Sequence, residues 1–252
     1  MRKLSDYARD VFSQFGEDGI IQKIFEVLGT ASRVCIEVGA HDGYRFSNTA
    51  NLWLHGWKGV LIEADAARYA ALVGHAKGYD CHCVKARVGS KGRQALEYVL
   101  QEHAVNTAVD FLSIDIDGDD YWVFKSLKRL APRVVCCEYN PTIPVHMDLV
   151  AEEGNYFGCS VLALVKLAES KGYKLVSMTT TNCFFVSAGD FEKFSDYETT
   201  LAALALSEHL TYLITGYDGD YVLSRRPTFG FRQPYKRKLV GAHFCPVAVE
   251  GR

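Results

Sequence analysis

The chain has 252 residues, of which 48% are hydrophobic and 23% are charged, and its net charge is −2. This length fits one large α/β domain, or one domain with an appendage, and the composition is that of an ordinary globular protein. The charge argues against a general nucleic-acid or membrane-surface binder, and no apolar run is long enough to span a bilayer. The N-terminus lacks a signal-peptide pattern and several cysteines lie in apolar runs, so we expect a cytoplasmic protein.

Apolar runs alternate with helical patterns along the chain, which predicts a mostly parallel sheet with helices on both faces. The expected strands cover residues 33–38, 59–64, 81–86, 109–117 and 133–140, followed by a hairpin of 173–178 and 183–186. The expected helices cover residues 20–28, 47–55, 66–76, 93–103, 121–130 and 160–168. Asp18 and Ser47 are natural caps for two of these helices. The long connection over 141–159 is typical of a lid or a substrate loop.

The C-terminal quarter differs from the rest of the chain. We expect a first domain over residues 1–190 and an extension over 191–252, packed on the same domain, that begins with a helix near 197–209. Its aromatic and basic residues are interleaved, which favours a binding surface for an anionic or sugar substrate, an arm for homo-oligomers, or a solvated tail. These residues are Tyr212, Tyr217, Tyr221, Phe229, Phe231, Tyr235, Phe244, Arg225, Arg226, Arg232, Lys236, Arg237 and Lys238.

The first expected strand ends in Glu37-Val38-Gly39-Ala40-His41-Asp42-Gly43, an acid followed by two glycines four residues apart. Glycine allows a tight turn and lets a ligand approach the backbone closely. Glu63 ends the second strand about twenty residues later, where nucleotide-binding folds place an acid on the ribose hydroxyls. The polar loop 13–19 precedes this region, and we expect Gln14 and Glu17 to lie over the turn.

Acids also end the later strands, as Asp115 and Asp117 on the fourth and as Glu138, next to Asn140, on the fifth. The carboxyl ends of parallel strands share one edge of a sheet, where ligands bind. Oxygen ligands suit Mg²⁺, so Asp115, Asp117, Glu138 and Asn140 are the candidate metal ligands. Cys81-His82-Cys83 lacks a second pair at zinc-finger spacing, and we expect no metal there.

Three stretches together resemble the FkbM-type family of S-adenosylmethionine (SAM)-dependent O-methyltransferases. They are Glu37–Tyr44, Leu61–Glu63 and Phe111–Gly118, and the similarity covers roughly residues 10–190. The family usually has Lys-x-Asp-x-Glu-Gly on its fourth strand, whereas this chain has Ser113, Asp115, Asp117 and Gly118, a departure that concerns the substrate contacts. The Asp117–Tyr121 and Glu138–Asn140 stretches are also similar, more weakly, to the magnesium-dependent macrocin-type sugar O-methyltransferases.

The resemblance implies a class I methyltransferase fold: a Rossmann-like, seven-stranded, mostly parallel sheet with a terminal antiparallel hairpin. It also implies SAM as the cofactor, Mg²⁺ as a second candidate, and methylation of a hydroxyl on a sugar or natural-product acceptor. The predicted cofactor-binding residues are Gln14, Glu37, Gly39, Ala40, Asp42, Gly43, Asn48, Glu63, Ala64, Ala86 and Asp115. The candidate general bases are His41, Asp117 and His146.

Two other functions stay open on the sequence alone. An NAD(P)-dependent oxidoreductase shares the glycine turn and the acid of the second strand, but its Gly-x-Gly-x-x-Gly fingerprint would need a glycine at His41. A non-catalytic nucleotide-binding module would keep the fold without the chemistry, and the number of acids at the strand ends argues against it. The expected closing hairpin favours the methyltransferase.

Overall fold

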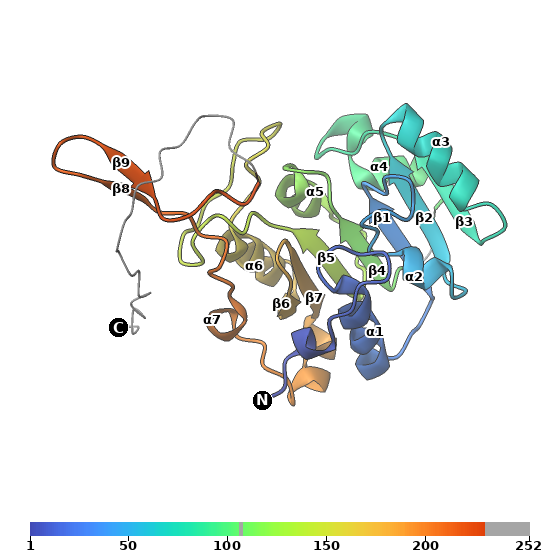
Figure 1. The fold of residues 1–252 in the computed structure, drawn as a ribbon. Helices are drawn as coiled ribbons and strands as arrows, with labels where there is room; N and C mark the ends of the chain where they lie inside the picture. Colours follow the sequence, from blue (N-terminus) through green and yellow to red (C-terminus); the bar gives the residue numbers. More distant parts are fainter. Residues whose placement is uncertain (106–107, 230–252) are drawn as a thin grey trace.

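A seven-stranded sheet with the order β3-β2-β1-β4-β5-β7-β6 forms the centre of the computed structural model, which describes residues 1–105 and 108–229 (Figure 1). Neighbouring strands from β3 to β5 run parallel, whereas β7 runs antiparallel to both β5 and β6. This is the class I methyltransferase sheet with its terminal hairpin, as the sequence predicts. The strands are β1 (Val34–Val38), β2 (Lys58–Glu63), β3 (Cys81–Lys85), β4 (Phe111–Ile114), β5 (Val134–Glu138), β6 (Tyr173–Met178) and β7 (Asn182–Ser187).

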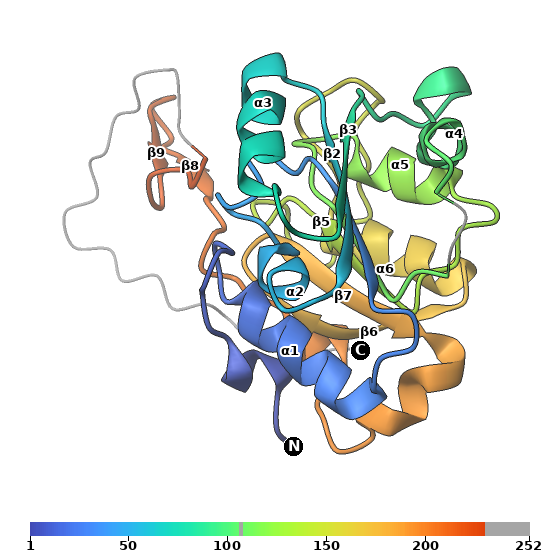
Figure 2. The same cartoon turned by 90° about the vertical axis from the view of Figure 1, so that its right-hand side faces the viewer.

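Helices cover both faces of this sheet, with α1 to α3 on one side and α4 to α6 on the other (Figure 2). Their bounds are α1 (Glu17–Leu28), α2 (Ala50–Trp53), α3 (Ala66–His75), α4 (Leu96–Glu102), α5 (Asp120–Ser126) and α6 (Val161–Ser170). Three short 3₁₀ turns are also present: η1 (Leu4–Tyr7) before α1, η2 (Gly92–Gln94) before α4 and η3 (Ala188–Phe194) after β7. None of the helices in the described ranges has the length and apolar character that crossing a membrane requires.

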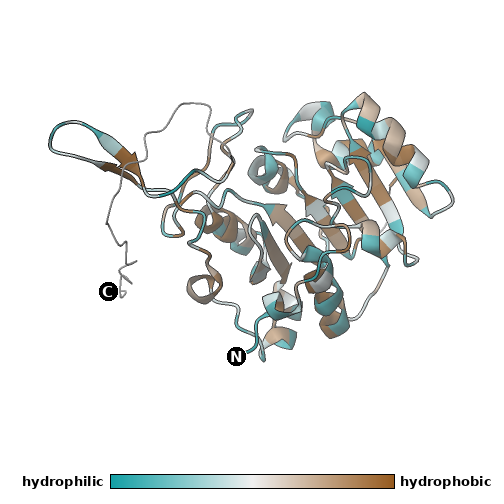
Figure 3. Cartoon of the chain, viewed as in Figure 1, coloured by the Kyte–Doolittle hydropathy of each residue, from teal (hydrophilic) through white to brown (hydrophobic). Residues whose placement is uncertain are grey.

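Each face of the sheet has its own hydrophobic core. Side chains alternate along a strand, so Val34, Ile36 and Val38 of β1 pack toward α4 to α6, whereas Cys35 packs toward α1 to α3. The apolar strands lie at the centre of the molecule and the polar residues are concentrated on the outer helix faces and loops (Figure 3). The alternation also places Glu37 on the face of Cys35, which matters for the site described below.

Several local predictions were wrong. Strand β4 ends at Ile114, so Asp115 and Asp117 lie in the loop that follows it. Asp18 is not a cap: helix α1 begins at Glu17, and the Asp18 carboxylate instead accepts the backbone N–H groups of the preceding Val11–Ser13 segment. The helix expected near 197–209 is reduced to one turn, α7 (Leu201–Leu204).

A small hairpin of β8 (Leu213–Thr215) and β9 (Tyr221–Leu223) follows α7 and projects from the sheet domain (Figure 1). The division at residue 190 and the role of the extension in a homo-oligomer stay predictions. Size-exclusion chromatography with light scattering on the full chain and on a chain ending at 229 would test whether the extension mediates a homo-oligomer. Part of the predicted aromatic and basic surface lies outside the described residues, namely Phe231, Arg232, Tyr235, Lys236, Arg237, Lys238 and Phe244.

Candidate active site

A cavity of about 570 Å³ opens at the carboxyl ends of the parallel strands. The loops after β1 to β5 contribute to its wall, together with the N-terminal loop and the turn between β6 and β7. Nine of the predicted site residues line it: Gln14, Gly39, His41, Glu63, Ala64, Ala86, Asp115, Asp117 and Glu138. The cavity therefore brings together the glycine turn, the acid of the second strand and the acids of the fourth and fifth.

Gly39 makes the closest backbone approach in this site. Its φ is +89°, and a Cβ added there would lie 1.9 Å from the Asp115 carbonyl oxygen. The Gly39 and Ala40 N–H groups both donate to the Ile62 carbonyl at 3.0 Å. Only glycine accommodates this conformation and this contact together. The turn after β1 is thus pressed between the end of β2 and the loop after β4.

The carboxylate of Glu63 closes the turn from the β2 side. One oxygen accepts the His41 N–H at 2.8 Å and the other accepts the Asp65 N–H at 2.7 Å. The side chain is 6% exposed and still lines the cavity. Each carboxylate oxygen keeps further lone-pair capacity, so Glu63 is fixed in place with acceptor positions to spare.

Glu37 does not line the cavity. It lies inside β1, with Leu61 and Ser113 as its partners on the two neighbouring strands, and points to the face covered by α1 to α3. Its oxygens accept hydrogen bonds from Ser47 Oγ, the Asn48 N–H and Thr49 Oγ1, each at 2.7 Å. Burial raises the pKa of Glu37 in spite of these donors. Glu37 organises the start of α2.

The remainder of the turn is also held from within. Asp42 accepts the N–H groups of Tyr44 and Arg45 at 3.0 and 2.8 Å. Burial acts to raise the pKa of Asp42, but these donors outweigh it and lower the pKa. His41, with φ +49°, accepts the Asp42 N–H on Nδ1 at 2.8 Å. Like Glu37, four other predicted cofactor residues do not line the cavity: Ala40, Asp42, Gly43 and Asn48.

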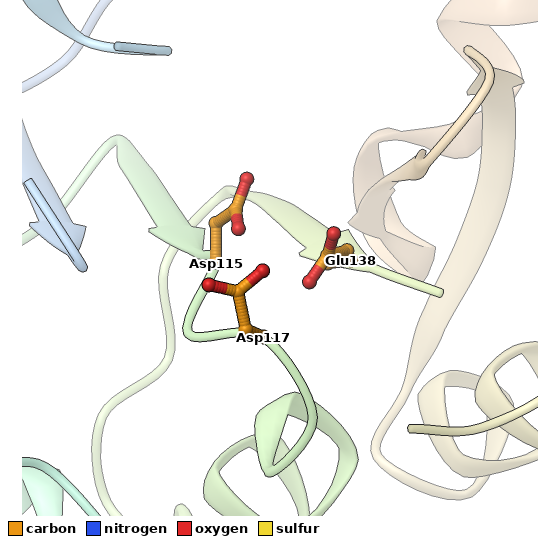
Figure 4. A group of neighbouring side chains, drawn as sticks. All are labelled: Asp115, Asp117 and Glu138. Atoms are coloured by element: carbon orange, nitrogen blue, oxygen red, sulfur yellow. The ribbon is translucent and has the colours of Figure 1, made fainter. Parts of the chain in front are cut away.

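Three acids converge on the β4–β5 side, where Asp115 and Asp117 face Glu138 (Figure 4). An oxygen from each lies within 4.8 Å of the others. Asp117 adopts φ +59°, an uncommon conformation for a residue other than glycine. Asp120, at the start of α5, shapes this loop by accepting the Ile116 and Gly118 N–H groups at 2.8 and 2.9 Å.

The acids of this cluster lack compensating charge. Burial first, and the neighbouring acids second, raise the pKa values of Asp115 and Glu138 well above their usual range, and burial raises that of Asp120 to about 6. In the described part of the chain, no lysine or arginine forms an ion pair with any of them. Such a cluster fits a cation, and its all-oxygen donor set suits Mg²⁺.

Two predicted site residues lie apart from the three-acid cluster. Asn140 directs its side-chain oxygen to Thr142 and donates its amide to the Phe157 carbonyl, so it lines a neighbouring cavity and not the cluster. His146 is exposed on the loop after β5 and lines neither cavity. Glu17, expected over the turn, is buried and accepts from Thr179 Oγ1 at 2.6 Å.

Besides Phe229, which belongs to the predicted aromatic and basic surface, the cavity includes residues that the sequence analysis missed, among them Arg45, Phe46, Arg68, Arg87, Val88, Asp119, Tyr156 and Thr181. Thr181 could have been predicted from the sequence, because the start of an antiparallel β7 must lie beside the end of β5. In the structure the Thr181 carbonyl accepts the Tyr139 N–H at 2.7 Å. The three arginines carry no motif: Arg45 and Arg87 lie in the loops after β1 and β3, and Arg68 lies in the first turn of α3.

No protein-family model matches this chain. No curated protein sequence matches it either. Among solved structures, the chain is similar to a SAM-dependent methyltransferase from Aquifex aeolicus, with 12% identity and a TM-score of 0.39, covering 68% of this chain and 88% of that one.

Two further structures are similar to the same degree. Magnesium protoporphyrin IX methyltransferase from Synechocystis PCC 6803 with bound SAM shows 11% identity and a TM-score of 0.42, covering 72% and 87% of the two chains. A glycopeptide N-methyltransferase complexed with sinefungin shows 10% identity and a TM-score of 0.41, covering 70% and 87%. The strand order and the antiparallel β7 carry the assignment of a class I methyltransferase fold to this chain.

Proposed function

We propose that this protein is a SAM-dependent O-methyltransferase that acts on a hydroxyl of a sugar or natural-product acceptor. One observation carries the proposal: a single cavity joins the Gly39 turn and Glu63 to the acids Asp115, Asp117 and Glu138. The nucleoside end of SAM would need the first kind of surface, the reacting hydroxyl of the acceptor would need the second, and both must lie within one site.

The residues present fit SAM. Glu63 keeps acceptor capacity for ribose hydroxyls after binding two backbone N–H groups. Ala64, Ala86 and Val88 supply a small apolar surface beside it for an adenine ring. The uncompensated acids would complement the positive charge of a sulfonium and an ammonium group. When bound, SAM supplies an electrophilic methyl carbon, which bonds to the acceptor oxygen as the sulfur takes back its bonding electron pair.

The acceptor proton must then pass to the protein or to solvent. We assign it to the Asp117 carboxylate, which lines both the main cavity and its neighbour. His41 fits this role less well, because its Nδ1 accepts a backbone N–H and a neutral ring then carries its own proton on Nε2. His146 lies outside both cavities. Holding the hydroxyl in line with the methyl carbon is the other task of the site.

Asp115, Asp117 and Glu138 would hold Mg²⁺ if the enzyme uses it. A bound Mg²⁺ would lower the pKa of a coordinated hydroxyl and offset the repulsion among the three acids. Dialysis against a chelator tests this assignment: turnover should fall and return on adding Mg²⁺. Full turnover after chelation would leave Asp117 as the proton acceptor and would exclude the metal.

Calorimetric titration with SAM, S-adenosylhomocysteine and NAD tests the cofactor. We expect binding of the first two and none of NAD. Glu63→Gln should weaken SAM binding about tenfold, since it removes one of the acceptors for ribose. Glu97→Gln is the matched control, because Glu97 also accepts backbone N–H groups but lies away from the cavity. Binding of NAD instead of SAM would contradict the proposal, and SAM binding without turnover on any hydroxylated acceptor would favour the binding module.

A further inference from the structure

A second cavity of about 280 Å³ adjoins the first on the β4–β5 side of the sheet. Four residues line both cavities: Asp117, Glu138, Tyr156 and Phe229. A molecule in the second cavity would therefore reach the same acids that border the proposed SAM site.

The wall of this second cavity combines two chemistries. Asp117, Asp120 and Glu138 contribute carboxylates on one side. Aromatic rings contribute the other side, namely Tyr139, Tyr156, Phe157 and Phe229. Three of these rings are unusually open to solvent, because Tyr156 is 85%, Phe157 69% and Phe229 59% exposed. Single exposed aromatics are common, but three around one acid-lined cavity form a binding surface.

Tyr156 belongs to a loop that is firmly attached to the domain. The Gly154 N–H donates to Asp119 at 2.7 Å, and Trp122 Nε1 donates to the Ala151 carbonyl at 3.0 Å. Glu153 forms an ion pair with Lys91 at 2.5 Å and accepts a hydrogen bond from Ser90. The loop thus presents the exposed Tyr156 ring from a fixed backbone, which lowers the entropic cost of binding a ligand to it.

The backbone also approaches Gly118 closely at this point. A Cβ added to Gly118 would lie 2.6 Å from the Asn155 carbonyl oxygen, and its φ of +139° already favours glycine. Asn155, the residue before Tyr156, therefore packs directly against the loop that carries Asp117. This contact sets the spacing between the aromatic and the acidic wall.

We propose that the second cavity is the acceptor subsite and that Tyr156 is its specificity-determining residue, stacking on the ring that carries the reacting hydroxyl. The inference rests on the proposed function and deepens it. Carboxyl oxygens accept hydrogen bonds, so a wall lined by the carboxyl groups of Asp117, Asp120 and Glu138 selects a ligand with several O–H donors, while an aromatic face selects a flat, apolar ring face. A sugar ring combines both better than a phenol does.

The test uses the full chain saturated with S-adenosylhomocysteine, whose binding is measured first by calorimetry. Saturation-transfer NMR then probes a panel of methyl hexopyranosides, deoxyhexopyranosides and pentopyranosides, with catechol as the phenolic probe. We expect a glycoside to bind and Tyr156→Ala to weaken it about tenfold, with S-adenosylhomocysteine affinity changed less than twofold. Tyr156→Phe should retain most of the glycoside affinity, because the ring face remains.

Tyr217→Ala is the matched control, since Tyr217 is a fully exposed tyrosine between β8 and β9 that lines neither cavity. It should bind the glycoside as the wild type does. Glycoside binding that survives Tyr156→Ala would overturn the role of Tyr156. Catechol binding in place of every glycoside, or binding of neither, would overturn the sugar assignment. Failure to bind S-adenosylhomocysteine would instead contradict the proposed function itself.

Discussion

The carboxylates of the β1–β2 half of the molecule and those of the β4–β5 half look alike in sequence but differ in their partners. Glu37, Asp42 and Glu63 each accept two or three hydrogen bonds from the surrounding chain. Asp115 and Glu138 face one another and Asp117, and burial and mutual repulsion raise their pKa values. Acids that the chain satisfies hold the backbone in shape, whereas acids it leaves under-satisfied are the ones available to a ligand.

The largest expected effect comes from Asp117→Asn. We expect turnover to fall about a thousandfold, because the amide does not take the acceptor proton. Stability should change by less than about 1 kcal/mol, since the exposed Asp117 carboxylate is not satisfied by the fold. Single-turnover transfer of a labelled methyl group measures turnover, and urea unfolding measures stability. Near-wild-type turnover would move the proton acceptor elsewhere.

Gly39→Ala tests the place where the two halves touch. The added Cβ clashes with the Asp115 carbonyl and the residue keeps φ +89°, so we expect a loss of about 3 kcal/mol and of SAM binding. Gly29→Ala isolates the cost of the positive φ from the cost of the clash, because Gly29 has φ +67° but open space around its Cβ position. It should cost about 1 kcal/mol and leave SAM binding intact. Equal losses in both variants would mean that the close approach to Asp115 is unimportant.

Glu37→Ala should destabilise the fold by about 3 kcal/mol in urea unfolding, because it leaves the buried donors of Ser47, Asn48 and Thr49 without an acceptor. Any loss of SAM binding should follow from the loosened start of α2 and should recover when the protein is stabilised, for example by an osmolyte. A stable variant that fails to bind SAM would instead place Glu37 in the cofactor site.

Glu138→Gln should stabilise the fold, whereas Glu37→Ala should destabilise it. Removing a partly buried charge that faces two other acids should raise the free energy of unfolding by about 1 kcal/mol in metal-free buffer at pH 7. Urea unfolding with and without Mg²⁺ measures it, and added Mg²⁺ should stabilise the wild type more than the variant. Destabilisation of the metal-free variant would show that Glu138 belongs with the satisfied acids.

The smallest effect is expected at Glu97, a satisfied acid away from the site. Burial acts to raise the pKa of Glu97, but the N–H groups of Leu130, Arg129 and Lys128 outweigh it and lower the pKa. Its stabilisation, about 1 kcal/mol, should be complete above the unfolded-state pKa near 4.3 and should be lost as pH falls through the lower folded-state value. Urea unfolding of wild type and Glu97→Gln should therefore differ at pH 7 and converge near pH 3. A constant difference across this range would contradict the assignment.

Much of the sheet could be predicted from the sequence, because buried parallel strands are continuous apolar runs and their alternation with helices indicates a parallel sheet. The cavity followed from the same pattern, since Gly39, Glu63 and Asp115 lie at strand ends. The missed features have a common cause. One-turn α7 and the position of Tyr156 depend on contacts with distant residues, such as Asn155 with Gly118, and these leave no periodicity in the chain.

Glu37 shows the limit in a single residue. A strand-end acid is expected at the edge of the sheet, but the register pairs Glu37 with Leu61 and Ser113 inside it. Its place in the alternation with Cys35 could have indicated a buried side chain, whereas the donors that satisfy it come from a helix start whose position is not encoded locally. The role of a carboxylate depends on its donors, and the donors are a property of the fold.

The ion pair between Glu153 and Lys91 has a kinetic consequence. It ties the loop over the proposed acceptor subsite to the connection after β3, on the side where the adenine surface lies, and the Lys91 side chain is 81% exposed. Surface ion pairs weaken as salt screens them. We therefore expect rising salt to loosen the loop at this one attachment, while the Gly154 and Trp122 hydrogen bonds still hold it, so that ligand exchange at both cavities accelerates modestly and together.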